Sequence, residues 1–264
     1  MSSITAADTT SHANNAIPAR PTIVLLPGMD GTGELFGPFI HALDGAFDIQ
    51  VVGYPTDRAL GYDALEALVR STLPRDRPFI LLGESFSGPI AVSIAASPPP
   101  GLQALVLCAS FAACPMPGLA PLQRLVRHLP IEHTPLGLLG WLLMGSRPQP
   151  GLRAALATSL SQLTPAALRA RVAAVLAVDH RDLLPRIRIP TLYLQARRDR
   201  VVPRRSLAPL QRHVSYIHKA GIDAPHFLLQ TAATQAADTL RSFVDTIQRT
   251  ARRADGAETP GHSA

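Results

Sequence analysis

The segment that most constrains the fold is an apolar run, Phe79–Leu82, that passes through Gly83-Glu84-Ser85-Phe86-Ser87-Gly88 into the helix-like stretch Ile90–Ala96. The small residues favour a tight strand-to-helix turn, because the helix must return close beside the strand. A serine at such a corner is held on a strained turn with its hydroxyl above the sheet. The usual pattern is G-x-S-x-G, whereas here Ser87 takes the last position and glycine follows one residue later. We interpret this as a variant that predicts Ser85 as a nucleophile; the alternative is an ordinary turn with an exposed serine.

A serine nucleophile needs a base, and His226 is the best placed of the nine histidines. It lies in the loop Gly221–Leu229, after the strand-like residues 214–218 and before a long helical segment. Pro225 stiffens the turn that leads into it. The main alternative is His218, although a residue inside a strand is more often packed or at the surface. The sequence therefore favours His226 as the general base.

The acid that orients the base is predicted from the loop 197–203, which follows the clearest late strand, 190–196. Asp199 in this loop lies beyond the carboxyl end of a strand, where ligand-facing residues of open α/β sheets collect. The order Ser, Asp, His along the chain favours a catalytic aspartate over a surface ion-pair partner. Asp182, which precedes the strand, and Asp223, which lies very near the histidine, remain weaker alternatives.

Donors for a developing oxyanion are suggested by the first strand, 22–26, which ends in the glycine-rich loop Pro27–Gly33. Such a loop can turn backbone N–H groups inward. We assign the donors as the N–H groups of Met29 and Phe86, the second of which follows the nucleophile. The glycines do not make G-x-G-x-x-G and no P-loop lysine follows, which argues against a nucleotide site.

Together these motifs resemble the α/β-hydrolase-fold serine hydrolases, the group that includes carboxylesterases, thioesterases and carrier-protein methyl ester esterases. The resemblance covers roughly residues 20 to 250. It rests on the loop Leu25-Leu26-Pro27-Gly28, the turn Gly83–Gly88, the pair Arg198-Asp199 and the run Pro225-His226-Phe227.

The resemblance implies a triad of Ser85, Asp199 and His226 and a hydrolysis that needs no cofactor and no metal. Two departures bear on the subfamily: Pro27-Gly28 stands where many members carry His-Gly, and Ser87 replaces a glycine. We expect an enzyme that cleaves carboxylic esters through an acyl-enzyme. The alternatives are an acyl thioesterase, an acyl-carrier-protein methyl ester esterase, and a non-hydrolytic ligand receptor or scaffold. An intact triad argues against the receptor, which has no need of all three residues.

Strand-like and helix-like segments alternate along the chain, which predicts an α/β fold with a mostly parallel sheet flanked by helices. Strands are expected at 22–27, 48–54, 79–84, 104–110, 191–196 and 214–219. Helices are expected at 33–44, 61–73, 86–97, 204–213 and 231–250.

The domain organisation follows from changes in composition. Residues 19–111 and 186–250 are expected to form the core, and residues 112–185 an inserted helical cap. The polar stretch 1–18 has no basic n-region or apolar h-region, so we expect a disordered leader and not a secretory signal. Residues 251–264 are expected to be a disordered tail.

The predicted cap is rich in proline, leucine and arginine, and it contains the apolar run Leu136–Met144. This run is too short to span a bilayer. Its apolar faces are expected either to line an acyl pocket or to pack the cap onto the core, with Trp141 in one of these roles. Some cap arginines are candidates for docking an acidic acyl carrier protein: Arg124, Arg127, Arg147, Arg153, Arg169 and Arg171.

The net charge of +6 does not indicate a nucleic-acid partner. Lys219 is the only lysine, and no basic run interleaved with aromatic residues is present. A small-molecule ester is therefore the expected partner, with no nucleic acid and no stable insertion in a membrane. Two cysteines, Cys108 and Cys114, are too few for a disulfide framework, which favours the cytoplasm.

Overall fold

A single six-stranded sheet forms the centre of the molecule. The computed structural model describes residues 20–146 and 150–257. All neighbouring strands pair in parallel, in the order β2-β1-β3-β4-β5-β6. The predicted parallel α/β sheet is therefore confirmed. The strands are β1 (Thr22–Leu26), β2 (Asp48–Val51), β3 (Phe79–Glu84), β4 (Leu102–Cys108), β5 (Thr191–Ala196) and β6 (Ile217–Ile222).

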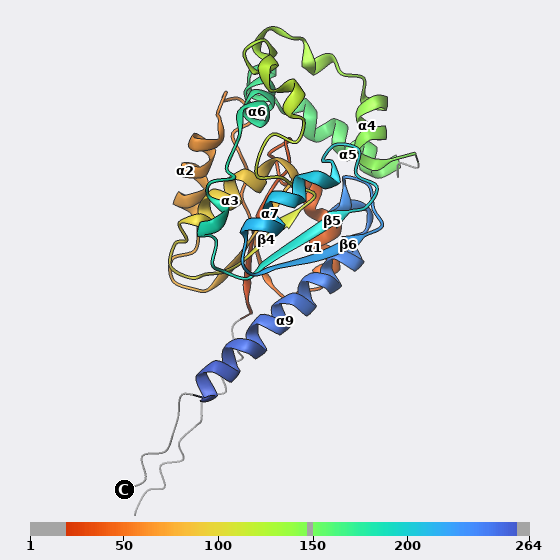
Figure 1. Cartoon of the computed structure of the whole chain (residues 1–264). Coiled ribbons are helices and arrows are strands. Elements are labelled where there is room, and N and C mark those ends of the chain that lie inside the picture. The colour runs from red at the N-terminus through yellow and green to blue at the C-terminus, as the bar shows by residue number, and fades with distance from the viewer. Residues whose placement is uncertain (1–19, 147–149, 258–264) are drawn as a thin grey trace, which may run out of the picture.

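Helices cover both faces of the sheet (Figure 1). The helices α1 (Gly37–Leu43) and α9 (Ala233–Ala257) pack on one face, and α2 (Tyr62–Thr72), α3 (Gly88–Ala96) and α7 (Ala208–His213) pack on the other. Because both faces are covered, β1 and β3 are buried along their whole length and read as continuous apolar runs.

The strand order reverses between β1 and β3, and this reversal positions the site. The chain moves outward from β1 to β2 and then returns to place β3 on the other side of β1. Loops that leave the carboxyl ends of β1 and β3 therefore diverge, and ligands of open α/β sheets bind in the crevice between them. The loop Pro27–Gly33 and the turn at Ser85 leave these two strand ends.

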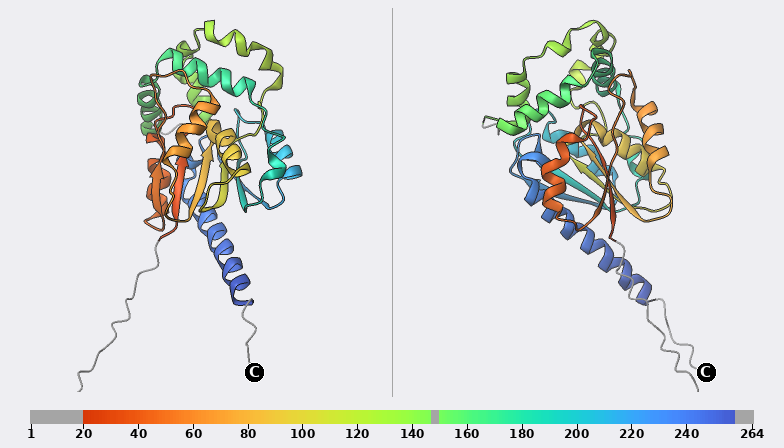
Figure 2. Two further views of the ribbon diagram at one scale, coloured as in Figure 1. Left: turned by 90° about the vertical axis from the view of Figure 1, so that its left-hand side faces the viewer. Right: turned by 180° about the vertical axis from the view of Figure 1, so that it is seen from behind.

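The segment between β4 and β5 forms a helical layer over the carboxyl ends of the strands, as Figures 1 and 2 show. It contains no strand in its described part, and an isolated antiparallel bridge between Ala113 and Asp179 joins its two ends. We call this layer the cap. Its main elements are the 3₁₀ helix η3 (Pro117–Arg124) and the helices α4 (Leu136–Met144), α5 (Pro150–Ser161) and α6 (Pro165–Ala177).

Two boundaries near the carboxyl terminus differ from the prediction. The last strand spans Ile217–Ile222 instead of 214–219, because Val214 ends helix α7 with a hydrogen bond from its N–H to Leu210 O. The last helix is preceded by a separate short helix, α8 (Leu228–Thr231), and α9 continues to Ala257, into the predicted tail 251–264. No proline interrupts α9, and Figure 1 shows it leading away from the body.

The leader predicted for 1–18 and the last seven residues of the predicted tail lie outside the described residues. Within the described ranges, no helix combines the length and the apolar character needed to cross a bilayer.

Candidate active site

Ser85 occupies a strained turn at the carboxyl end of β3. Its φ is 48°, in the left-handed region that non-glycine residues rarely adopt. The turn requires glycine on both sides: a Cβ at Gly83 would lie 2.8 Å from the Cβ of Ala91, and one at Gly88 would collide with the Oγ of Ser110. The hydroxyl of Ser110 also donates to Ser85 O at 2.5 Å, which fixes the turn from the β4 side.

Ser87 explains why this turn departs from the usual glycine pattern. Its side chain is fully buried and its hydroxyl donates to Pro27 O in the loop after β1. The same hydroxyl is 2.6 Å from the phenol oxygen of Tyr54, which follows β2. A glycine here would leave both partners without this contact. The serine therefore links the turn to the neighbouring loop.

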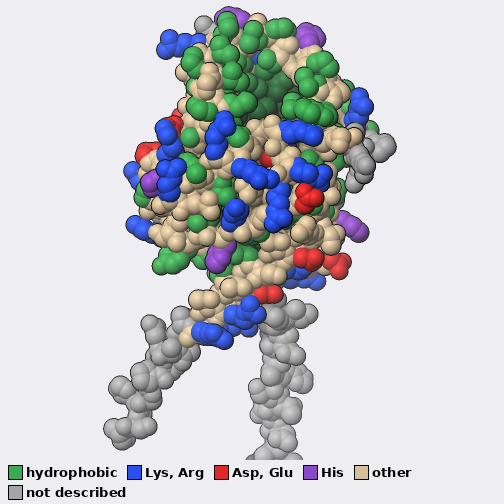
Figure 3. Space-filling model, turned by 45° about the vertical axis from the view of Figure 1, so that its right-hand side comes forward, with side chains coloured by type: hydrophobic (Ala, Val, Ile, Leu, Met, Phe, Trp, Pro, Cys, Tyr) green, Lys and Arg blue, Asp and Glu red, His purple; other side chains and the backbone are tan. Residues whose placement is uncertain are grey.

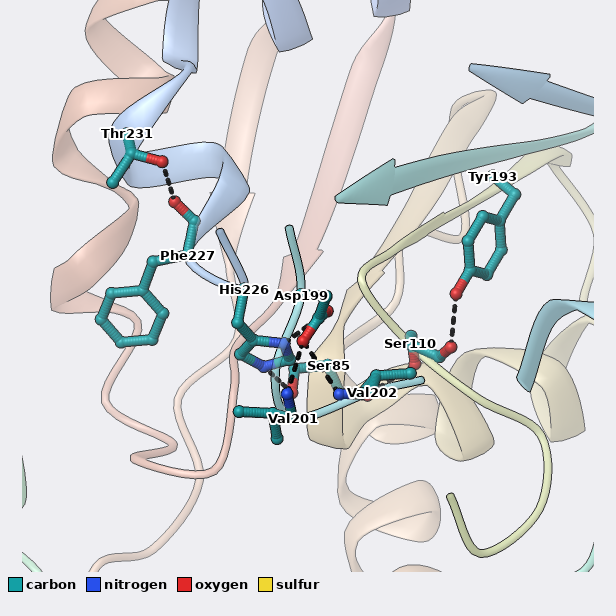
Figure 4. A network of polar contacts seen from close by, with 9 residues as sticks. All are labelled: Ser85, Ser110, Tyr193, Asp199, Val201, Val202, His226, Phe227 and Thr231. Carbon is teal, nitrogen blue, oxygen red and sulfur yellow. Dashed lines mark hydrogen bonds and ion pairs between the residues drawn. The ribbon is translucent and has the colours of Figure 1, made fainter. Parts of the chain in front are cut away.

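The structure brings His226 and Asp199 to Ser85 (Figure 4). The Oγ of Ser85 lies 2.8 Å from Nε2 of His226, and Nδ1 of His226 lies 2.8 Å from Oδ2 of Asp199. The histidine and aspartate side chains are each only 4% exposed. The second carboxylate oxygen accepts the N–H groups of Val201 and Val202 at 2.8 and 2.9 Å, so it is held by its own loop.

The alternative residues lie elsewhere. His218 is exposed on the edge strand β6 and packs its ring against Phe243. Asp182 is exposed, and Asp223 forms an exposed ion pair with Arg198. None of the three contacts Ser85 or His226. Among the described residues, no three His, Cys, Asp or Glu side chains are grouped as metal ligands.

An apolar pocket of about 270 Å³ opens beside the hydroxyl of Ser85. Its walls come from the loops of the core and from the cap, mainly η3 and α6, and among the described residues Ser85 supplies the only polar side chain of the lining. Trp141, which the sequence placed either in the pocket or in the packing of the cap onto the core, does not line the pocket. It is 47% exposed and packs its ring against the guanidinium of Arg200 in the core loop after β5, so the packing role is the one that the structure favours. The lining residues are Met29, Ser85, Phe86, Phe111, Pro115, Met116, Leu119, Leu122, Val126, Val172, Val175, Leu176, Val201 and Val202.

Both predicted oxyanion donors belong to this lining. Met29 and Phe86 line the pocket together with Ser85. In the described loops and turns, no backbone hydrogen bond uses the N–H of either residue. The two groups are therefore free to bind an oxygen atom of a ligand in the pocket.

Arg171 of the cap helix α6 holds the Met29 loop in place, and sequence reasoning missed this role. Its side chain is 1% exposed. One guanidinium nitrogen donates to Met29 O at 2.7 Å and to Asp30 O at 2.8 Å, and the other donates to Pro55 O at 2.9 Å. Gly31 is required here, because a Cβ at this position would collide with the guanidinium. The cap therefore determines the shape of the loop that carries a predicted oxyanion donor.

Glu84, immediately before Ser85, is a buried carboxyl group. Burial raises its pKa from the ordinary value of 4.5 to about 7, against the opposing effect of a hydrogen bond from Gln230 Nε2 to Oε1 at 2.9 Å. The negative charge of Asp30 also raises the pKa, and the nearby His226 lowers it. Near neutral pH this group therefore changes charge directly behind the serine.

Stability should fall as Glu84 ionises. The folded state binds the Glu84 proton more tightly than the unfolded chain does. Protonation of Glu84 therefore stabilises the folded state fully below pH 4.5, and this stabilisation is lost as the pH rises to 7. A shift of this size corresponds to roughly 3 kcal/mol. Glu84→Gln keeps an acceptor for Gln230 and cannot ionise. We expect urea unfolding to show this variant more stable than wild type at pH 8, with most of the difference gone at pH 5. An equal difference at both pH values would contradict this expectation.

Comparison with known proteins matches residues 62–228 to the family described as serine aminopeptidase, S33. The chain belongs to this family of α/β hydrolases. It resembles solved structures over most of its length. The enol-lactonase from Burkholderia xenovorans LB400 has a TM-score of 0.73 at 17% identity, over 85% of this chain and 91% of that one. A hydrolase from Oleispira antarctica has a TM-score of 0.73 at 19% identity, over 86% of this chain and 91% of that one. These structures confirm the predicted α/β-hydrolase fold.

A curated relative is similar over a shorter stretch. Phytyl ester synthase 1, chloroplastic, from Arabidopsis thaliana is 34% identical over 82 residues, which are 29% of this chain and 12% of the relative. The chain thus spans a small part of that protein's length. A further solved structure, a bacterial membrane phospholipase A, has a TM-score of 0.70 at 19% identity over 87% of this chain and 80% of the other.

Proposed function

We propose that this hydrolase cleaves carboxylic esters of apolar acyl groups through a serine acyl-enzyme. The observation that carries the proposal is the position of Ser85 in the wall of a pocket whose other lining side chains are all apolar. An acyl chain in that pocket gains roughly 0.8 kcal/mol for each methylene removed from water. The carbonyl carbon then lies at the pocket mouth, next to the serine hydroxyl.

The geometry supports a reaction in two halves. His226 takes the proton of Ser85 Oγ as this oxygen attacks the carbonyl carbon, and Asp199 holds the imidazole tautomer and stabilises its cation. The N–H groups of Met29 and Phe86 bind the oxyanion. His226 returns the proton to the departing alcohol, which leaves the acyl group on Ser85. In the second half His226 takes a proton from water, the water oxygen attacks the acyl carbon, and His226 returns the proton to Ser85 Oγ as the free acid leaves.

The pocket argues against an aminopeptidase, although the family's description carries that name. An aminopeptidase must bind the free α-ammonium group of its substrate, which calls for a carboxylate or several oxygen acceptors near the scissile bond. No charged side chain lines this pocket among the described residues. An ammonium group would lose its hydration there without a partner.

Transfer of the acyl group to an alcohol is the second candidate, because the Arabidopsis relative is named as an ester synthase. An apolar pocket that excludes water gives an alcohol the advantage over water in resolving the acyl-enzyme. This candidate uses the same triad. Adding a long-chain alcohol to the assay would reveal it as a new ester product with a matching decrease in free acid.

A panel of p-nitrophenyl esters of increasing acyl length tests the proposal. We expect kcat/KM to rise about fourfold for each added methylene until the pocket is filled. Val175→Phe should shorten the preferred chain, because the added ring occupies the pocket. Ala177→Phe adds the same ring at the exposed end of α6 and serves as the matched control. Indifference of kcat/KM to acyl length would contradict the proposed substrate class.

The proposed place of action is the cytoplasm. Cys108 and Cys114 are both free thiols, which supports a reducing compartment.

A further inference from the structure

Exposed large hydrophobic residues are concentrated on one part of the cap. Of the nine such residues in the described chain, seven lie between residues 116 and 141. Scattered single apolar residues are normal on a protein surface, but a contiguous group marks an interaction site. We call these seven residues the cap face: Met116, Leu119, Leu122, Leu125, Leu136, Leu138 and Trp141.

Helix α4 contributes three of them and is unusual for a surface helix. Its sequence, LGLLGWLLM, has no polar residue on any side. Only Gly140 and Met144 are buried, whereas Leu138 is 50% exposed and Trp141 is 47% exposed. A helix that is apolar all round normally lies in a protein core or in lipid. Here the core covers one side, and the other side is left facing outward.

The part of the cap face formed by η3 and Met116 is continuous with the pocket that contains Ser85. Met116, Leu119 and Leu122 are each more than 40% exposed and also line that pocket. Figure 3 shows hydrophobic side chains gathered around a hollow at the cap end of the molecule. An apolar chain could therefore pass from an apolar surrounding into the pocket along side chains that are apolar throughout.

Arginine side chains flank the cap face and carry positive charge that no described carboxylate neutralises. Arg124 ends η3, Arg153 approaches Gly137 of α4, and Arg200 lies with its guanidinium carbon 4.2 Å from the centre of the Trp141 ring. All three are exposed, and none forms an ion pair with a carboxylate in the described part of the chain.

We propose that the cap face docks on the surface of a lipid bilayer that contains anionic headgroups. The exposed leucines and Trp141 insert below the headgroups, and the three arginines bind the phosphates. Because the pocket shares its wall with this face, the acyl chain of a lipid ester can leave the bilayer and reach Ser85 without crossing water. The inference extends the proposed ester hydrolysis by naming a lipid ester as substrate and a bilayer as partner.

Charge and shape favour a bilayer over a protein partner. Two copies of the cap face would bring arginines against arginines, which opposes self-association. The described cap offers no strand whose edge another chain could extend. An anionic bilayer instead satisfies both the apolar centre and the positive rim. A second copy and an acidic carrier protein remain as the outcomes that would overturn the proposal.

The single tryptophan of the chain makes the test direct. Trp141 emission should shift to shorter wavelength when vesicles of phosphatidylglycerol and phosphatidylcholine are added, and brominated lipids should quench it. Leu136 and Leu138 lie on the cap face but outside the pocket. Leu136→Gln and Leu138→Gln should each weaken vesicle binding by about tenfold or more. Val51→Gln, an exposed apolar residue away from the cap, should bind as wild type does. Vesicles of phosphatidylcholine alone should bind more weakly, because they offer no net negative charge.

The outcomes separate this proposal from the proposed function. Leu138→Gln should keep wild-type turnover of a short soluble ester, and Ser85→Ala should still bind vesicles. Unchanged emission with vesicles, or loss of binding in neither leucine variant, would overturn the docking proposal while ester hydrolysis stands. Self-association, or binding to an acidic carrier protein in the absence of vesicle binding, would overturn it as well. Vesicle binding by a protein that hydrolyses no ester would instead overturn the function alone.

Discussion

Ser85→Ala should lower kcat/KM for p-nitrophenyl esters by about 10⁴- to 10⁶-fold and leave the fold intact. The variant lacks the only side-chain oxygen that the described residues contribute to the pocket lining, so none of them can replace it. Labelling by a fluorophosphonate should disappear with the activity. Turnover close to wild type would show that the acyl-enzyme forms elsewhere or not at all.

Two further variants separate chemistry from conformation. Ser85→Gly also removes the proposed nucleophile, but glycine accepts the φ of 48° without strain. It should therefore be roughly 1 kcal/mol more stable than Ser85→Ala, measured by urea unfolding. Ser93→Ala removes a half-buried serine from the helix that follows the turn and should be fully active. A stability order in which glycine is the worse residue would contradict the strained turn.

Local patterns predicted the candidate triad because its members stand where strands end. Ser85, Asp199 and His226 follow β3, β5 and β6, and parallel strands bring their carboxyl ends to one edge of the sheet. A short apolar run followed by turn residues can be recognised within ten residues of sequence. The distance between the three residues along the chain did not matter, since the sheet brings their loops together.

Contacts that depend on the relative position of distant elements could not be predicted in this way. Arg171 donates to a carbonyl 142 positions earlier in the chain, and nothing in the sequence of α6 distinguishes it from the other cap arginines. The hydrogen bond between Tyr54 and Ser87 could not be predicted either, because the sequence showed Ser87 only as a departure from the G-x-S-x-G pattern. Side-chain polarity was visible in the sequence, but the partner of each group was set by the docking of the cap and loops.

The cap shows the same division between local and long-range information. Its helical character and apolar content followed from composition, and the structure has α4, α5 and α6 in this segment. Which side of each cap helix is buried could not be derived from composition. Because α4 is apolar on every side, its sequence gives no hydrophobic stripe from which a buried face could be chosen. The cap side of the pocket is lined mainly by η3 and α6, and Trp141 of α4 lies outside the pocket against Arg200 of the core.

Arg171→Met should destabilise the protein and slow catalysis together. The change removes three hydrogen bonds from a charged donor and leaves the buried carbonyl of Asp30 and the partly buried carbonyls of Met29 and Pro55 without it. We expect a loss of about 3 kcal/mol or more in the free energy of unfolding. The released loop also carries the N–H of Met29, which is a proposed oxyanion donor, and the loss of one such donor typically lowers kcat by about 10²- to 10³-fold.

The matched control is Arg169→Met on the same helix. Arg169 pairs with Glu132 at a partly exposed site, with Nε 3.2 Å from Oε2, and it contacts neither Ser85 nor the loop after β1. Its removal should cost at most about 1 kcal/mol and leave kcat unchanged. Measurements of kcat at saturating substrate, made where Arg171→Met is still folded, separate a displaced donor from simple unfolding. A folded Arg171→Met protein with wild-type kcat would show that the cap does not control the position of the Met29 N–H.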